Sequence, residues 1–379
     1  MSNEFILIVA WKSLYRNYRW RSISSKLSKI KINCVKLLQE KDSYICSLLD
    51  LHLITNKSSE KTFVTYTDNL SPFSILTVNG DKADMYVHEI EKDRLMAVCG
   101  FKNLVMLVNP SKIRVVDLNM DFKEVWMTDD IRISDSSFGV GQWSCSSRYC
   151  TIVGSRVCIV TETDSSNSTN SAMYMNLKSL TVNPAVMPTP EIIATGISYA
   201  ILNQSKAKSV YWICDGKISV GHNNDAIVSM ANCIDQSKGD TLLLSCLAES
   251  GEWLVAAGLR SKSESTPTNE FFLISKKSKT IKDRLSIGCD SNMSEGSKLS
   301  MTQAQGIYIV ACIRMFRSMA IFAICRGKMT MIDGHVMTDP GNDSSQNYGI
   351  VAVWNKKKAV EFYVAGSKAF LNRITVELP

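Results

Sequence analysis

The segment from Trp11 to Lys36 holds the clearest concentration of side chains that could bind a ligand. Aromatic and basic residues alternate at its start: Trp11, Lys12, Arg16, Arg19, Trp20 and Arg21. Cationic side chains neutralise phosphates, and aromatic rings stack on nucleic-acid bases. These residues are therefore a candidate site for binding nucleic acid or a partner protein.

Two other interpretations of this segment stay open. A stretch rich in Arg and Ser and poor in acids is also typical of a mitochondrial presequence, although Glu4 is atypical of one. The segment could equally form an amphipathic helix that buries its aromatic rings on the rest of the protein and leaves its bases in solvent. We favour this third interpretation, a structural or partner-docking arm over residues 1–36.

The charge of the chain is concentrated in the same region. The protein has 43 basic and 36 acidic residues and a net charge of +7. No acid lies between Glu4 and Glu40, a window that holds eight bases, so the remaining 35 bases nearly balance the 36 acids. The positive arm is therefore a local feature of an otherwise balanced chain.

Elsewhere the sequence predicts no reaction chemistry. Its four histidines, His52, His88, His222 and His335, are far apart, and no Cys-x-x-Cys pair occurs, so we expect no metal site. No Gly-x-Ser-x-Gly motif is present, and the glycines of residues 137–143 lack the third glycine and the lysine of a phosphate-binding loop. We predict no catalytic residue and no cofactor.

Cysteine usage and apolar run length predict the compartment. Many of the 12 cysteines, including Cys246, Cys312 and Cys325, lie in apolar runs, as expected of buried thiols. No apolar run reaches the roughly 18 residues that a transmembrane helix needs. We expect a cytoplasmic or nuclear protein, with a mitochondrial location as the alternative. Six Asn-x-Ser/Thr sequons would instead suit a secreted protein: Asn56, Asn69, Asn167, Asn203, Asn292 and Asn342.

Residues 37–379 are predicted to form one all-β domain. Short apolar runs rich in Val, Ile, Tyr and Phe alternate with clusters of Gly, Ser, Asn and Asp, a pattern typical of strands and turns. No helix of three or more turns is expected in this part. Polar stretches such as residues 261–269 are expected to be exposed loops between strands.

Repetition narrows the fold class to a single β-propeller. The hairpins ICDGKISV (residues 213–220) and ICRGKMTM (residues 324–331) share a strand, a turn with Gly, a Lys and a second strand. Similar turns with a base recur along the chain. The basic residues that mark them are Lys61, Lys112, Arg156, Lys217, Lys279, Lys328 and Lys368. We therefore predict about seven four-stranded blades.

The chain resembles the WD-repeat class of propellers at two places. Gly221-His222 follows the first of those hairpins, and Gly334-His335 follows the second. In that class a Gly-His pair precedes the innermost strand of a blade, so the resemblance implies that His222 and His335 are structural blade histidines. No Trp-Asp dipeptide ends a blade, which makes this chain similar to a divergent member. The resemblance bears on the fold rather than on function.

A propeller without a catalytic constellation predicts a binding platform. The leading hypothesis is a non-enzymatic scaffold that mediates protein-protein interactions within a larger intracellular complex. One alternative is an RNA-associated propeller that binds nucleic acid through its basic arm. Another, suggested by the sequons, is a secreted or viral receptor-binding glycoprotein.

Overall fold

The protein is described from a computed structural model. The residues that the structure describes are 29–38, 48, 51–54, 61–66, 73–88, 95, 97–101, 103–109, 112–128, 150–153, 156–164, 169–176, 191–195, 211–214, 217–220, 226–229, 239–262, 265–288, 298–313, 318–338, 347–355, 359–367 and 370–378. Apart from a single 3-10 turn at Leu118–Met120, their regular structure consists of β-strands. The prediction of an all-β body is confirmed.

These strands form seven antiparallel sheets, numbered here in chain order. Sheet 1 consists of β2 (His52–Ile54), β3 (Lys61–Tyr66), β4 (Phe73–Asn79) and β5 (Lys82–His88). Sheet 2 consists of β6 (Ala97–Phe101), β7 (Leu104–Asn109), β8 (Lys112–Asp117) and β9 (Lys123–Thr128). Sheet 3 consists of β10 (Cys150–Val153), β11 (Arg156–Asp164), β12 (Thr169–Asn176) and β13 (Glu191–Thr195).

The later sheets repeat the same order of strands. Sheet 4 has three described strands, β14 (Tyr211–Cys214), β15 (Lys217–Val220) and β16 (Ala226–Ser229). Sheet 5 consists of β17 (Thr241–Ser250), β18 (Trp253–Lys262), β19 (Ser265–Ser275) and β20 (Thr280–Gly288). Sheet 6 consists of β21 (Lys298–Ala304), β22 (Ile307–Ile313), β23 (Ser318–Cys325) and β24 (Lys328–Met337). Sheet 7 consists of β25 (Asn347–Trp354), β26 (Ala359–Gly366), β27 (Leu371–Glu377) and β1 (Lys31–Lys36).

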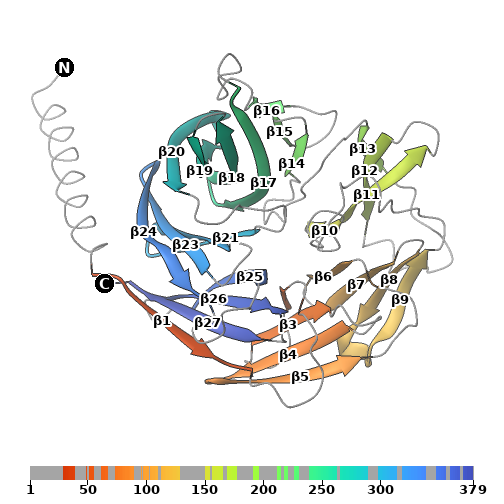
Figure 1. Ribbon diagram of the computed structural model, residues 1–379. Coiled ribbons are helices and arrows are strands. Elements are labelled where there is room, and N and C mark those ends of the chain that lie inside the picture. The colour runs from red at the N-terminus through yellow and green to blue at the C-terminus, as the bar shows by residue number, and fades with distance from the viewer. Residues whose placement is uncertain are drawn as a thin grey trace, which may run out of the picture.

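The sheets are arranged around a centre, and the first strand of a sheet lies nearest to it (Figure 1). These first strands contact one another in sequence: β17 contacts β21, β21 contacts β25, β25 contacts β2, and β2 contacts β6. Radial arrangement of antiparallel sheets, each with its own four-strand meander, defines a β-propeller. The predicted fold class is confirmed, and the described residues form seven sheets.

The ring closes by pairing strands from opposite ends of the described chain. Strand β1 lies antiparallel to β27, with Lys31 opposite Glu377 and Lys36 opposite Asn372. Exposed Lys31 and Asn33 alternate with half-buried Ile32 and Cys34, which pack on the core of sheets 6 and 7. Residues 31–36, which the sequence analysis placed in the N-terminal arm, therefore form the outer strand of sheet 7.

The core lies between neighbouring sheets. Strand β22 is buried from Tyr308 to Ile313, because its two faces pack on the sheets at either side. This explains the continuous apolar runs of the sequence, since a strand covered on both faces has no polar side. Cys246, Cys312 and Cys325 are buried thiols, as predicted.

The basic turns that suggested the repeat do not occupy equivalent hairpins. Lys217 begins the second strand of sheet 4, whereas Lys328 begins the fourth strand of sheet 6. The two most similar hairpins are therefore not copies of one position in a blade, although each of the seven marker positions falls within a different sheet or the connection between two of its strands. A turn followed by a lysine fits any exposed antiparallel hairpin. The recurrence of such turns therefore indicates the number of sheets but not which strands of a sheet each hairpin joins.

The described residues of the polar stretch 261–269 lie in strands rather than in a loop, contrary to expectation. Residues 261–262 extend β18 and residues 265–269 begin β19, and Arg260 lies opposite Thr268 in the ladder. Asn269 is fully buried. The Ser- and Thr-rich sequence of this stretch favours exposure. The long antiparallel pairing of β18 with β19 supplies hydrogen-bond partners to the backbone and overrides that preference.

Candidate functional site

The arm residues singled out by sequence lie outside the described residues. This holds for Trp11, Lys12, Arg16, Arg19, Trp20 and Arg21. Their proposed role in binding therefore stays a prediction.

The two histidines of the Gly-His pairs differ in how far the structure describes them. His222 lies outside the described residues, so its role as a structural blade histidine stays a prediction. His335 lies near the end of β24, and its imidazole is exposed. Its backbone N–H donates a 2.8 Å hydrogen bond to Asp333 Oδ1.

A third histidine, His88, was not expected to have a structural role. It lies at the end of β5, with its ring 5.1 Å from Phe73 and 4.0 Å from Phe122, centroid to centroid. Burial lowers the pKa of His88, opposed by the nearby carboxylate of Asp121. The neutral ring thus joins the aromatic packing between β4, β5 and the turn before β9.

A polar cluster lies between sheets 7 and 1, and we call it the closing seam: Lys61, Asn355, Glu361, Tyr363 and Arg373. Lys61 Nζ donates to Glu361 Oε2 and, at 2.8 Å, to the hydroxyl of Tyr363. The Tyr363 hydroxyl donates to the same carboxylate at 2.7 Å, and Asn355 Nδ2 donates to its other oxygen at 2.8 Å. The carboxylate is thus hydrogen-bonded on both oxygens.

Ionisation in the closing seam follows from these contacts. Burial by itself would raise the pKa of Glu361, but hydrogen bonds from Lys61, Asn355 and Tyr363 outweigh it and hold that pKa below its usual value. Burial and the adjacent Glu361 carboxylate strongly raise the pKa of Tyr363. At neutral pH the acid is therefore ionised and the phenol protonated.

The seam is built to join two sheets rather than to react. The Glu361 side chain accepts three hydrogen bonds, and the Tyr363 hydroxyl is committed as a donor to it. The Tyr363 ring packs on Phe63, 4.7 Å away between centroids. Arg373 extends the seam, because it donates to the carbonyl of Gly80 at 2.9 Å and contacts Asp81. No general base or nucleophile is left poised by this arrangement.

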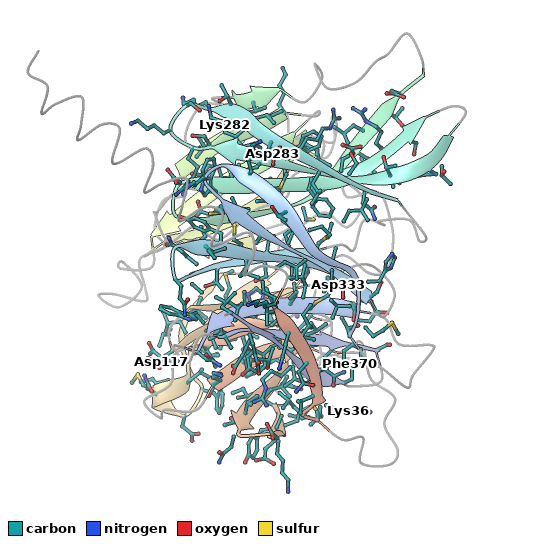
Figure 2. The ribbon with its side chains drawn as sticks, turned by 90° about the vertical axis from the view of Figure 1, so that its left-hand side faces the viewer. Lys36, Asp117, Lys282, Asp283, Asp333 and Phe370 are labelled. Carbon is teal, nitrogen blue, oxygen red and sulfur yellow. The ribbon has the colours of Figure 1, made fainter. Side chains whose placement is uncertain are left out.

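A different kind of surface lies on one side of the ring. In a four-stranded meander, the turns after the first and third strands lie at one edge, and the connection after the second lies at the other. Figure 2 views the ring edge-on, with Asp117 at the end of β8 on one side and Lys36 and Phe370 on the other. We call the side that carries Asp117 and the tight turns the turn face.

Exposed bases outnumber exposed acids among the described residues of the turn face. The bases at or next to its strand ends are Lys29, Lys31, Lys82, Lys123, Lys217, Lys277, Lys279, Arg326 and Lys328. The corresponding acids are Asp81, Asp121, Glu124, Glu252 and Glu377. One part of this face, which we call the basic turn patch, comprises Lys217, Lys277, Lys279, Arg326 and Lys328 of the consecutive sheets 4, 5 and 6.

The described residues also bear on metal sites and membrane spans. No group of three or more His, Cys, Asp or Glu side chains that could hold a metal ion occurs among the described residues. None of the described elements is a helix long and apolar enough to cross a membrane.

Comparison with known proteins identifies the architecture. The N-terminal domain of Nup159 superimposes with a TM-score of 0.56 at 10% identity, covering 91% of this chain and 95% of that one. A chain of a mitotic checkpoint complex gives a TM-score of 0.57 at 8% identity, with 91% of each chain covered. A Saccharomyces cerevisiae complex in which Dbp5 is bound to Nup159, Gle1, IP6 and ADP gives 0.52 at 11% identity, covering 92% of this chain and 95% of the other.

These similarities extend over nearly the whole chain and show its fold. No family model matches the sequence, and no curated protein matches it significantly. The likeness to propellers is therefore structural, and membership of the WD-repeat class stays a prediction.

Proposed function

We propose that this protein is a non-enzymatic β-propeller scaffold that mediates protein-protein interactions within a larger intracellular complex, in the cytoplasm or nucleus. The observation that carries the proposal is the likeness over 91–92% of the chain to chains solved within protein assemblies, a mitotic checkpoint complex and a complex in which Dbp5 is bound to Nup159. Rigid rings present many turns at fixed positions, which suits the simultaneous binding of several partners.

The chemistry of the described residues supports a binding role. Glu361 and Tyr363 are both hydrogen-bonded to Lys61, so they hold sheets 7 and 1 together. The turn face, in contrast, presents exposed charged side chains on short hairpins. Charged groups at such positions steer association and fix the orientation of a partner.

Affinity purification of the tagged full chain, followed by size-exclusion chromatography and mass spectrometry, tests the proposal. We expect at least one protein to co-elute with the chain in a fixed molar ratio and to retrieve it in a reciprocal purification. A monodisperse chain that retains no protein at a fixed ratio would contradict the scaffold function.

The RNA-associated alternative depends on the N-terminal arm. Charge reversal at Arg16, Arg19 and Arg21 should abolish RNA binding if the arm supplies it, with the melting temperature unchanged. The same variant should leave protein partners of the propeller in place. The secreted alternative predicts a mass increase at the sequons after expression in a eukaryotic host, and an unmodified intact mass would remove it.

A further inference from the structure

We propose that the basic turn patch binds an acidic segment of a partner protein. This inference rests on the proposed scaffold function and names the chemistry of one partner. The patch joins five exposed bases of three consecutive sheets: Lys217, Lys277, Lys279, Arg326 and Lys328.

The turns that carry most of these bases are fixed against one another. Lys276 N–H donates a 3.0 Å hydrogen bond to the carbonyl of Glu252, which ties the β19–β20 turn to the β17–β18 turn of the same sheet. Gly327 lies against Trp253, since a Cβ atom at that glycine would be 3.1 Å from the indole ring. The β23–β24 turn of sheet 6 is therefore held against sheet 5.

A hydrogen bond farther along the strands reinforces this contact. Met329 N–H, next to Lys328, donates to Asp283 Oδ2 at 2.6 Å, which links β24 to β20. The bases thus project from a preorganised framework. Preorganisation reduces the entropy that is lost when a ligand binds.

The described acids at these turns are fewer than the bases. Lys276 forms an ion pair with the nearly buried Glu249 at 3.0 Å, which leaves that acid facing Lys276. Glu252 is the exposed acid on the same turns. The exposed bases therefore give this arc of the turn face a positive potential, which attracts a negatively charged ligand.

Two of the bases occupy backbone conformations that do not favour them. Lys279 has φ 54° and Arg326 has φ 53°, both in the left-handed region. Arg326 and Gly327, with φ 75°, form a two-residue hairpin of the kind that prefers Asn-Gly. Glycine, Asn or Asp suits these positions better than Lys or Arg. The backbone preference of these turns thus does not account for the choice of Lys and Arg there.

The apolar chemistry of the patch favours a protein ligand over nucleic acid. The aromatic rings beneath it, Trp253 and Tyr308, are 8% and 9% exposed and pack in the core between sheets 5 and 6. The described part of the patch therefore offers no ring on which a base could stack, the contact that single-stranded binding uses. Carboxylates along a flexible acidic segment can bind to the array of basic side chains without an exposed aromatic ring.

The chain provides variants that separate charge from folding. Replacement of both Lys279→Asn and Arg326→Asn removes two charges and places a favoured residue at each positive φ. We expect a melting temperature equal to or above that of the wild type. Gln305→Asn is the matched control, because Gln305 has φ 51° and precedes Gly306 in the uncharged β21–β22 hairpin of sheet 6.

Fluorescence anisotropy of the full chain with labelled oligo-glutamate tests the proposal. The double variant should bind this peptide about three- to tenfold more weakly, since each exposed ion pair contributes modestly. Gln305→Asn should bind like the wild type, and salt should weaken binding. The N-terminal arm is present in every variant, so its contribution cancels in the comparison.

Three results of the binding assay would overturn the patch proposal. These are equal oligo-glutamate binding by wild type and double variant, equal binding of oligo-glutamine, and tighter binding of oligouridylate that the double variant also loses. If a partner protein co-purifies in a fixed ratio with both forms, the scaffold function stands and the patch proposal fails. If no partner co-purifies while the charge-dependent peptide binding holds, the scaffold function fails instead.

Discussion

The closing seam between sheets 7 and 1 and the contact between sheets 5 and 6 join blades by different means. Sheets 5 and 6 pack through apolar side chains, among them Phe271 and Phe322, whose ring centroids lie 5.1 Å apart. The closing seam adds ionic and hydrogen-bonded contacts around Glu361 to its apolar packing.

The difference follows from the connectivity of the chain. Sheets 5 and 6 are consecutive, so a short connection already keeps them together. Lys61 and Glu361 are 300 residues apart, and bringing such distant segments together carries a larger loop-closure entropy. Directional polar contacts at that junction specify which surfaces meet, whereas apolar contact alone tolerates sliding.

The largest expected effect is at the apolar contact. Phe322→Ala removes a fully buried ring and leaves a cavity against Phe271, so we expect unfolding free energy to fall by about 3–5 kcal/mol. Urea denaturation monitored by fluorescence measures it. A decrease below about 1 kcal/mol would show that the neighbouring sheets collapse into the space and that this contact is not tightly packed.

The next largest effect is at the closing seam. Glu361→Gln keeps the shape of the side chain but removes its charge and one acceptor for Lys61 and Tyr363, which costs about 1–3 kcal/mol. Glu377→Gln is the control, because Glu377 is exposed on β27 of the same sheet and its replacement should change stability by less than about 0.5 kcal/mol. Equal losses for both variants would argue against a special role for the seam.

Acid sharpens the same comparison. Because the folded pKa of Glu361 is held below its usual 4.5, its contribution to stability is fully present above that pH and is lost as pH falls toward the folded value. The stability of the wild type should therefore decline more steeply below about pH 5 than that of Glu361→Gln. Parallel declines in urea titrations of the two proteins would contradict the hydrogen-bonded, ionised state of this acid.

The smallest effect is expected for the corresponding change between sheets 5 and 6. Asp283→Asn retains a side-chain oxygen that can accept the hydrogen bond of Met329 N–H, so the loss should be below about 1 kcal/mol. The same urea measurement applies. A loss larger than that of Glu361→Gln would reverse the contrast and place the more important polar link between consecutive sheets.

The sequence predicts the strands better than it predicts how they assemble. Alternation along β20 and the continuous apolar run of β22 are visible in the residues themselves, because a strand with one or two covered faces shows it directly. The number of sheets follows from the recurring turns. The position of each hairpin within its blade does not follow from the sequence, because a lysine after a turn suits every hairpin of a blade.

Features that depend on pairing between distant segments could not be predicted, because the local sequence does not show which segments meet. Ile32 and Cys34 alternate with polar neighbours, a strand signal that the high positive charge of residues 12–36 obscured. Nothing in the local sequence links Lys61 to Glu361 and Tyr363, which meet only when the ring closes. The turn face could be predicted only in part. The sequence shows basic residues after turns, but that these residues lie on one side of the ring follows only from the meander topology.

The pairing of β1 with β27 also has a consequence for biosynthesis. The strand that completes sheet 7 is synthesised before every other described strand, while its partner is synthesised after all of them. Until β27 is made, β1 has no neighbour in its sheet, so the ring closes only after the other described strands have been synthesised. Such non-local pairing is slow, and the waiting edge is open to association with other unfinished chains.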